Sequence, residues 1–381
     1  MKRKLGDIFE ISSGGTPSKL HPEYYDGNIP WVKTGDLKWK YLYDVEDYIT
    51  EKGLNNSSAK MYEANTVFIA MYGATIGATS ILKFPACTNQ ACAAFKKNEE
   101  VLPEYLYFFL KSKRKKFIKD GVGGAQPNIS VGYLKNVDWE VRNLEEQHEI
   151  VNVLNNIQYI VEQREQEMQL LDELIKARFV EMFGDPVSNQ HGYEKVCLSE
   201  LADIKIGPFG SLLHKEDYIE GGHPLLNPSH IIDGKVAPDN KLSISDEKYN
   251  ELSAYQLHVG DVIMGRRGEM GRCAVVPDEG YLCGTGSLMI RTKGDVTADY
   301  IQKVISFPSF KKTIEDMAVG QTMPNLNVPI VSTFQIVKPP IEVQNRYYTF
   351  VAQVNKSKVT VQKALDETQK LFDSLMQQYF G

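Results

Sequence analysis

LEEQHEIVNVLNNIQYIVEQREQEMQLLDELIKARFVEMFG occupies Leu144–Gly184, and a second segment of the same kind occupies Ile341–Gly381. Apolar side chains recur in both at alternating steps of four and three, and neither segment has an internal Gly or Pro. A 3.5-residue period over several heptads predicts two long helices that pair with each other as a coiled coil. The predicted seam positions are Ile150, Leu154, Ile157, Val161, Arg164, Met168, Leu171, Ile175, Arg178 and Met182, and then Tyr347, Val351, Val354, Lys358, Val361, Leu365, Thr368, Phe372, Leu375 and Tyr379.

The same apolar pattern would also arise if the two helices did not pair. Each would then be an amphipathic helix that packs on its own globular part. If the helices pair antiparallel, the two globular parts lie at opposite ends of a rod and are related by a pseudo-twofold axis. About 38 helical residues at ~1.5 Å each make this rod roughly 55 Å long.

Both helical segments end on the same dipeptide, Phe183-Gly184 and Phe380-Gly381, which are 197 positions apart. Other pairs keep nearly this offset. They are Asp7-Ile8 with Asp203-Ile204, Pro127-Asn128 with Pro324-Asn325, and Gln147 with Gln344. A repeated offset at both ends and in the middle indicates a duplicated unit, in which a globular module is followed by a long helix.

The duplication defines four segments, and the fold class is α+β. We expect a first globular domain at residues 1–143, a first long helix at 144–184, a second globular domain at 185–340 and a second long helix at 341–381. Turn signals such as Asp26-Gly27 and Asp233-Gly234 separate short β-rich runs, and helical stretches follow Pro103 and Ala298. Each globular domain is therefore predicted to be mixed α/β.

Charge and cysteine content set limits on the class of protein. The first long helix carries nine acidic and three basic side chains, so it accounts for the whole formal net charge of -6 and leaves the rest of the chain balanced. A nucleic-acid partner is therefore not excluded. The five cysteines form no CxxC pair, which indicates neither a zinc site nor a disulfide framework and favours the cytoplasm.

No membrane association is expected. The uncharged run 64–82 is long enough to raise the question. Its duplicate at 262–276 carries Arg266, Arg267, Glu269 and Arg272, which is typical of a soluble strand, turn and strand.

Basic and amide side chains in predicted turns are the candidate DNA contacts, because Arg can bind guanine, and Asn or Gln adenine, by two hydrogen bonds. The run Lys111–Lys119 has six bases in nine residues on a predicted helix, where it would track phosphates. Ordinary solvated surface would give the same patterns. The candidates are Lys33, Thr34, Lys38, Lys40, Tyr72, Thr75, Lys113, Lys115, Lys116, Asn227, Ser229, His230, Arg266, Arg267 and Arg272.

Three partial motifs suggest enzymes, but each is incomplete. Asn227–His230 has the outline of an amino-methyltransferase loop without its second Pro and its aromatic residue. Pro238-Asp239 with Asp246–Lys248 has the outline of a nuclease centre, but a turn and a helix N-terminus explain it better. Gly260–Arg266 lacks the Lys-Ser/Thr of a phosphate loop. We therefore predict no catalytic, cofactor-binding or metal-binding residue in this chain.

Several motifs together resemble the specificity subunit of type I restriction-modification systems, and the resemblance covers the whole chain. They are GGTP at Gly14–Pro17, IPWVKTGDL at Ile29–Leu37, GGAQPN at Gly123–Asn128, IGPFGS at Ile206–Ser211 and GQTMPN at Gly320–Asn325. The resemblance implies that each globular domain is a target recognition domain for one half of a bipartite site in double-stranded DNA. It also implies that the antiparallel coiled coil sets the spacing between them.

The resemblance further implies two methyltransferase subunits and restriction subunits as partners. S-adenosylmethionine, ATP and Mg²⁺ would then belong to those partners. Two alternatives stay open at this point. One is a self-contained DNA-modifying or cleaving enzyme with its own specificity domains, and the other is a coiled-coil scaffold without a role on DNA.

Overall fold

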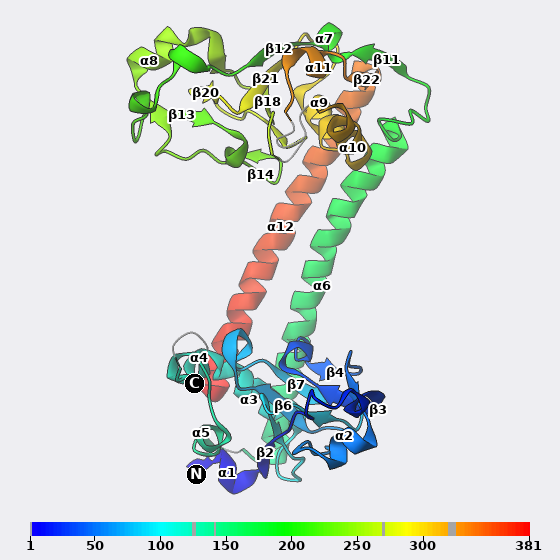
Figure 1. Ribbon diagram of the computed structural model, residues 1–381, viewed down its shortest axis with the longest axis vertical. Helices are drawn as coiled ribbons and strands as arrows, with labels where there is room; N and C mark the ends of the chain where they lie inside the picture. Colours follow the sequence, from blue (N-terminus) through cyan, green and yellow to red (C-terminus); the bar gives the residue numbers. More distant parts are fainter. Residues whose placement is uncertain (1, 124–126, 141, 269–270, 319–324) are drawn as a thin grey trace. The chain divides into compact units, whose positions relative to one another are not determined.

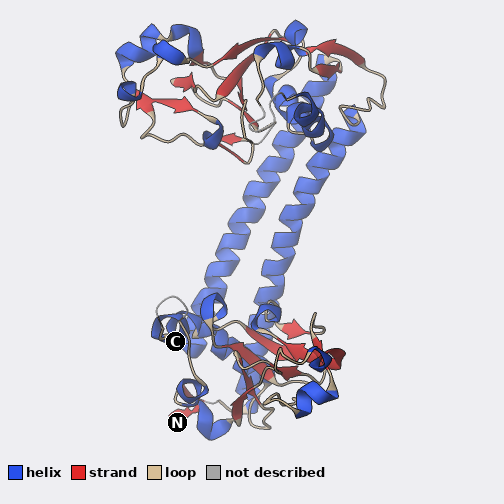
Figure 2. Cartoon of the chain, viewed as in Figure 1, coloured by secondary structure: helices blue, strands red, loops and turns tan. Residues whose placement is uncertain are grey.

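The computed structural model describes residues 2–123, 127–140, 142–268, 271–318 and 325–381. The chain forms two compact units. Unit 1 consists of Met1–Glu167 and Val361–Gly381, and unit 2 consists of Met168–Thr360. Each unit contains one globular part, in which helices flank strands, and one end of each long helix (Figures 1 and 2).

The two long helices are α6 (Leu144–Phe183) and α12 (Ile341–Phe380). In unit 1 the beginning of α6 lies beside the end of α12 (Figure 1). Ile150 and Leu154 share a core with Phe372 and Met376. The helices therefore run antiparallel in this unit. The antiparallel pairing predicted from the heptads is confirmed, and every predicted seam position is buried or half-buried.

The same pairing occurs in unit 2, where the end of α6 lies against the beginning of α12. Lys358 Nζ lies 2.6 Å from Asp172 Oδ1, and the hydroxyl of Tyr347 donates to the carbonyl oxygen of Ile175 at 3.2 Å. Tyr347 also belongs to the core of the second globular part, together with Phe179. Each long helix thus packs on its partner and on a globular part, so the alternative of unpaired helices is wrong.

Unit 1 is built on a five-stranded sheet with the order β2-β9-β6-β7-β4 and a three-stranded sheet with the order β5-β3-β8. Its remaining strands, β1 and β10, form an antiparallel pair. The bounds are β1 Lys2–Lys4, β2 Ile11–Ser13, β3 Tyr25–Val32, β4 Tyr41–Leu42, β5 Tyr48–Ile49, β6 Val67–Ala70, β7 Thr79–Leu82, β8 Cys87–Thr88, β9 Cys92–Phe95 and β10 Asp138–Glu140, with helices α1 Leu5–Ile8, α2 Glu51–Asn55, α3 Pro103–Ser112, α4 Arg114–Asp120 and α5 Val131–Lys135.

Unit 2 repeats this plan. The order β12-β21-β18-β19 matches β2-β9-β6-β7, and β16-β13-β20 matches β5-β3-β8. The bounds are β11 Glu194–Cys197, β12 Ala202–Ile206, β13 His223–Leu226, β14 Ile231–Ile232, β15 Lys235–Val236, β16 Ser243–Ile244, β17 Gln256–Leu257, β18 Val262–Gly265, β19 Cys273–Val275, β20 Tyr281–Cys283, β21 Ser287–Thr292 and β22 Gln335–Lys338, with helices α7 Leu198–Leu201, α8 Asp246–Glu251, α9 Ala298–Ile305, α10 Pro308–Met317 and α11 Val328–Ser332.

The central strands are buried on both faces, because side chains alternate across a strand and each face has its own core. In β6, Val67 and Ile69 face the large core that contains α3, whereas Phe68 and Ala70 face a smaller core. These four residues are at most 1% exposed. This explains why the run reads as continuously apolar without being a membrane segment.

The repeated glutamine has the same role in both units. Gln147 Oε1 accepts from the backbone N–H of Leu102, and its Nε2 donates to the carbonyl oxygens of Glu100 and Arg142. Gln344 Oε1 accepts from the N–H of Thr297, and its Nε2 donates to backbone carbonyl oxygens in the same way. Both glutamines are fully buried. Each therefore fixes the first turns of a long helix to the N-terminus of α3 or α9.

The repeated Phe-Gly pair also has a structural role. Phe380, at the end of α12, packs against Tyr105 of α3 with ring centroids 5.1 Å apart. Phe183, at the end of α6, packs against Tyr300 of α9 at 5.2 Å. In each unit the last turn of one long helix thus closes the core of the globular part.

Candidate DNA interface

Several predicted contacts of unit 2 come together around the segment Gly284–Gly286. The backbone N–H of Arg266 donates to the carbonyl oxygen of Gly286 at 3.1 Å, and Gly286 N–H donates to Asn227 Oδ1 at 3.4 Å. Arg272 Nη1 donates to the carbonyl oxygen of Pro228 at 3.3 Å. The loop after β13 and the turn after β18 therefore lie side by side, although they are far apart in the sequence.

The side chains of this cluster differ in how they meet solvent. Ser229 and Arg267 are exposed. His230 is only 6% exposed, and its Nδ1 lies 2.8 Å from the carbonyl oxygen of Leu225. Its ring therefore supports the loop from inside. Of these three side chains, Ser229 and Arg267 are the ones placed to meet a ligand.

Arg266 is half-buried, and its Nε donates to Asn325 Oδ1 at 3.1 Å. Burial lowers the pKa of Arg266, and the nearby charge of Arg267 adds to this effect. Its guanidinium stays ionised, because the unperturbed pKa of arginine is far above neutral pH. We conclude that Arg266 fastens the turn to Asn325, while the neighbouring Arg267 points outward from the same turn.

Unit 1 places its predicted contacts at the equivalent positions. In unit 1 the N–H of Asn89 donates to the carbonyl oxygen of Val32, and the N–H of Met71 donates to that of Ala91. The same two bonds occur in unit 2, from Gly284 to Leu226 and from Arg266 to Gly286. Tyr72 forms a bridge with Asn128, and Arg267 forms the same bridge with Asn325. The two units therefore present Tyr72 and Arg267 at one structural position.

Within unit 1, Lys33 and Thr34 lie in the loop after β3, at the start of the short helix Thr34–Asp36. Lys33 Nζ is 2.5 Å from Asp47 Oδ1 and 5.0 Å from the ring centroid of Trp31. Thr75 Oγ1 donates to the carbonyl oxygen of Tyr72 at 2.9 Å. Lys33 and Thr75 thus have partners inside the protein, whereas Tyr72 is 44% exposed.

Lys38 is exposed, but Lys40 is directed toward the long helix. Lys40 Nζ donates to Asn155 Oδ1 of α6 and lies 4.5 Å from the ring centroid of Phe108. Burial lowers the pKa of Lys40 to about 8. Its ammonium is therefore held by intramolecular contacts in this structure.

The basic run Lys111–Lys119 does not lie on one helix as predicted. Helix α3 ends at Ser112, α4 begins at Arg114, and Lys113 lies at the break. Lys113 Nζ donates to the carbonyl oxygen of Phe380, whereas Lys115 and Lys116 are exposed on α4. The break directs Lys113 toward the end of α12 and leaves Lys115 and Lys116 in solvent.

The comparisons with known proteins agree with this architecture. The model for the type I restriction modification DNA specificity domain matches residues 1–171 and again residues 190–368. The chain belongs to this family. As a member it is a DNA specificity subunit of a type I restriction-modification system, which confirms the function predicted from the sequence motifs.

Two relatives of this specificity subunit illustrate the range of similarity. The type I restriction enzyme MjaIX specificity subunit of Methanocaldococcus jannaschii is 26% identical over 98% of this chain and 91% of its own length. The EcoR124I/EcoR124II specificity subunit of Escherichia coli is 31% identical, but over only 40% of this chain and 39% of its own length.

Solved structures share the fold of this specificity subunit. The S subunit of a type I system from M. genitalium matches with a TM-score of 0.54 at 15% identity, covering 100% of this chain and 96% of that one. A chain from a structural study of type I complex assembly and conformational transition matches with a TM-score of 0.66 at 16% identity, covering 100% and 97%. Two α/β domains and two long helices are therefore the common architecture.

The partial enzyme motifs have structural explanations in this specificity subunit. Ser245 Oγ accepts from the N–H of Lys248 at the start of α8, and Lys248 Nζ pairs with Glu251 at 3.1 Å. The residues with the outline of a nuclease centre, Asp246–Lys248, thus form a capped helix N-terminus. Within the described part of the chain, no group of three or more His, Cys, Asp or Glu residues is arranged to hold a metal ion. No helix among the described residues is long and apolar enough to cross a membrane.

Sequence reasoning missed the segments that join the loops, Asn89–Ala91 and Gly284–Gly286. The two glycines Gly284 and Gly286 could have indicated a close approach of the backbone to another loop. In the structure a Cβ on Gly284 would meet Asn227, and a Cβ on Gly286 would meet Pro228. Other parts of the recognised motifs, residues 124–126 and 320–324, and the predicted turn residue Glu269 lie outside the described residues.

Proposed function

We propose that each unit recognises one half of a bipartite target in double-stranded DNA through the loops that meet at Asn89–Ala91 in unit 1 and at Gly284–Gly286 in unit 2. The main support is that the two units share one fold but have different side chains at equivalent positions of these loops. Four strands of one sheet and three strands of the other follow the same order in both units, and each unit has the same buried glutamine. At the exposed turn, however, unit 1 has Tyr72 and unit 2 has Arg267. Such divergence suits two modules that recognise different base sequences.

Arg267 and Ser229 are the proposed base contacts of unit 2. Both side chains are exposed, and the two loops that carry them lie side by side. An exposed arginine can bind guanine by two hydrogen bonds in the major groove, and serine can bond either a donor or an acceptor on a base edge. Lys115 and Lys116 are proposed to contact phosphates in unit 1, which adds affinity without sequence preference.

Catalysis is proposed to reside in partner subunits. Two methyltransferase subunits would dock on this chain and supply S-adenosylmethionine, and restriction subunits would supply ATP- and Mg²⁺-dependent cleavage. The duplication supports two equivalent docking places, because each unit offers the same arrangement of a long-helix start, a long-helix end and α3 or α9. The assembled complex would act in the cytoplasm.

The test is a domain exchange in cells that also express the methyltransferase subunit. Residues 185–340 are replaced by the equivalent domain of a relative, and methylated motifs are mapped by sequencing. We expect one half of the motif to change and the other half to stay. The reciprocal exchange of residues 1–143 is the matched control and should change the other half. A change in both halves, or in neither, from a single exchange contradicts the proposal.

A separate assay addresses the alternative of a self-contained enzyme. The purified chain is incubated with mixed-sequence DNA and S-adenosylmethionine, or with ATP and Mg²⁺, and methyl transfer and strand breaks are measured. No activity is expected until the methyltransferase subunit is added. Methylation or nicking by the chain alone would show that catalysis resides in this polypeptide.

A further inference from the structure

Phe209 is an exposed aromatic side chain on the loop that leads from β12 toward β13 in unit 2. It is 63% exposed, and among the described residues it does not belong to the apolar cores of this unit. Single exposed apolar side chains are ordinary on protein surfaces, so the exposure alone indicates no function. The informative feature is where the loop lies.

The loop begins directly against the segment Gly284–Gly286. The N–H of Gly207 donates to the carbonyl oxygen of Ser287 at 3.1 Å. A Cβ on Gly207 would lie only 2.1 Å from the carbonyl oxygen of Gly284, so this close approach requires glycine. Phe209 follows two residues later. It therefore leaves the protein next to the segment at which the proposed base-reading loops meet.

Beyond this contact the loop projects into solvent. Pro208 is buried, whereas Phe209 and Gly210 are exposed. Gly210 has a φ of +62°, and a Cβ on it would meet no atom of the described residues within 4 Å. The N–H of Leu212 donates to the carbonyl oxygen of Phe209 at 3.5 Å, which closes a turn. The ring of Phe209 thus lies on a short turn that is anchored on one side and open on the other.

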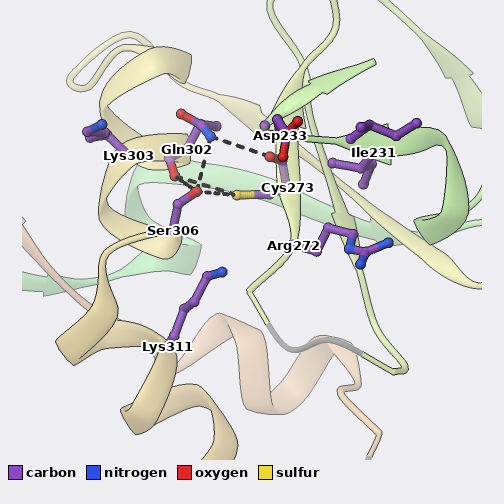
Figure 3. A pocket seen from close by; sticks show the side chains of 10 residues that line it. Ile231, Asp233, Arg272, Cys273, Gln302, Lys303, Ser306 and Lys311 are labelled. Carbon is purple, nitrogen blue, oxygen red and sulfur yellow. Dashed lines mark hydrogen bonds between the residues drawn. The ribbon is translucent and has the colours of Figure 1, made fainter. Parts of the chain in front are cut away.

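The turn after β18 is also fixed to the structure behind it. Gln302 Nε2 of α9 donates to the carbonyl oxygen of Cys273, the first residue of β19, at 3.4 Å (Figure 3). Arg272 directs its guanidinium away from Lys311 (Figure 3), and its Nη1 donates to the carbonyl oxygen of Pro228 at 3.3 Å. The loops around Gly284–Gly286 therefore have a supported backbone, which a precise contact to a base requires.

The corresponding loop of unit 1 has the same length. A Cβ on Gly14 would lie 1.8 Å from a backbone carbonyl oxygen of β8, which is the same close approach that Gly207 makes in unit 2. Seven residues after each of these glycines, His21 and His214 directly precede a short helix. The residues between can therefore be matched one to one.

This matching pairs Phe209 with Thr16. Thr16 Oγ1 donates to Gln90 Oε1, so the threonine is tied to the segment Asn89–Ala91 of its own unit. Phe209 has no polar group on its side chain and cannot form such a bond. Unit 1 thus secures its loop at the position where unit 2 exposes an aromatic ring.

Double-stranded DNA is the partner that this position favours. Across the segment from Phe209, Thr285 and Arg267 are exposed polar side chains, which suit the edges of base pairs better than the apolar centre of a protein interface. In the major groove the base pairs offer one apolar group, the methyl group of thymine, and phenylalanine is among the side chains that contact it.

We propose that Phe209 contacts the methyl group of a thymine in the half-site that unit 2 recognises. The half-site then contains at least one A·T pair, and Phe209 favours thymine over cytosine at that position. The inference rests on the proposed function and specifies how one further loop of unit 2 reads a base.

The test removes one methyl group from the DNA at a time. The target motif is mapped by methylation sequencing, and the half-site of unit 2 is assigned by the domain exchange. Each thymine of this half-site is then replaced by deoxyuridine, which keeps every hydrogen-bonding group and lacks only the methyl group. We expect the full chain, assembled with the methyltransferase subunit, to bind one of these duplexes about fourfold more weakly, as for one buried methylene group.

Three variants assign this effect to a residue. Phe209→Ala should bind the thymine target more weakly than the wild type and should not respond to deoxyuridine at that position, whereas Phe209→Leu should keep part of the response. Val259→Ala is the matched control and should behave as the wild type. Val259 is 59% exposed and precedes β18, so it lies at the opposite end of this strand from Arg267. Thymines of the other half-site should respond equally in all proteins.

The possible outcomes separate this contact from the proposed function. A response that persists in Phe209→Ala assigns the methyl contact to another residue and overturns the inference, as does a wild type that binds its target specifically without any response. Impaired assembly of Phe209→Ala with the methyltransferase subunit, at unchanged duplex binding, places the ring in a protein interface and also overturns it. If the wild type does not prefer its target to random duplex, the proposed function fails and the inference fails with it.

Discussion

Gln147 and Gln344 show how a single side chain joins a long helix to a globular part. We predict that Gln147→Leu or Gln344→Leu destabilises its own unit by about 1–3 kcal/mol, because buried backbone N–H and carbonyl groups lose their partners. The measurement is urea unfolding of the full chain, monitored with a fluorescent probe in each unit. Gln163→Leu, at an exposed position of α6, is the control and should change stability little. Equal effects of all three substitutions would contradict this role.

Lys40 gives a prediction for pH. Its folded-state pKa of about 8 is below the model value of 10.5, so burial makes its charged form unfavourable in the folded state. Between these two pKa values the unfolded chain binds more protons than the folded chain, and stability from this group rises as pH increases. We expect wild type to gain stability relative to Lys40→Met between pH 8 and 10.5. A constant difference between the two proteins across this range would show that Lys40 titrates normally.

Arg267 and the pair Lys115 and Lys116 test the difference between base and phosphate contacts. Arg267→Ala should cost about 1–3 kcal/mol of specific binding and relax the sequence preference at one position of one half-site. Replacing Lys115 and Lys116 with Gln should weaken binding to all duplexes alike and reduce the salt slope by about 0.9 per lost contact. Binding to target and to random duplexes at several salt concentrations separates the two outcomes. Uniform weakening by Arg267→Ala would assign that residue to the backbone.

At the level of elements, the long helices were predictable because forty residues of one unbroken period give a strong signal. The heptads do not say which residues face each other across the pair. The contact of Asp172 with Lys358 supplies that alignment in unit 2. Strand pairing in the globular parts was not predictable, since strands of two to eight residues pair with distant partners, as β3 does with β8.

The candidate site was predictable only in part, for the same physical reason. Residue types and turn signals identified the loops of Asn227 and Arg266, but their meeting at Gly284–Gly286 depends on non-local hydrogen bonds that leave no periodic mark. Sequence reasoning also grouped Lys40 with the DNA contacts. A lysine stem lies favourably along aromatic surface, and Phe108 of α3 provides that surface.

For the whole molecule, α6 and α12 each pass from one unit into the other, at Glu167 and at Thr360. We predict that inserting one heptad after Glu167 and one after Thr360 leaves the apolar seam intact and lengthens each helix by about 10 Å, or roughly 3 bp of duplex. The variant should stay folded, lose its original target and select a spacer about two or three base pairs longer. Methylome sequencing with the methyltransferase subunit present checks this. Methylation of the unchanged motif by a folded variant would falsify a measuring role for the helices.

A single-helix insertion is the control for this experiment. Adding seven residues after Glu167 alone lengthens one helix and not the other, so the paired seams no longer match. We expect this variant to lose stability and methylation together, in contrast to the doubly extended protein.

The discontinuity of unit 1 determines the order in which the newly made protein can mature. Unit 2 is one continuous stretch that ends at Thr360, whereas unit 1 needs Val361–Gly381 to cover Tyr105. A ribosome makes residues 1–167 first, but this part cannot complete its core until Val361–Gly381 has also been made. All residues of the second unit are therefore made before the first unit is complete. Until Val361–Gly381 is made, the apolar surface around Tyr105, in the oldest part of the nascent chain, lacks the cover that Phe380 provides.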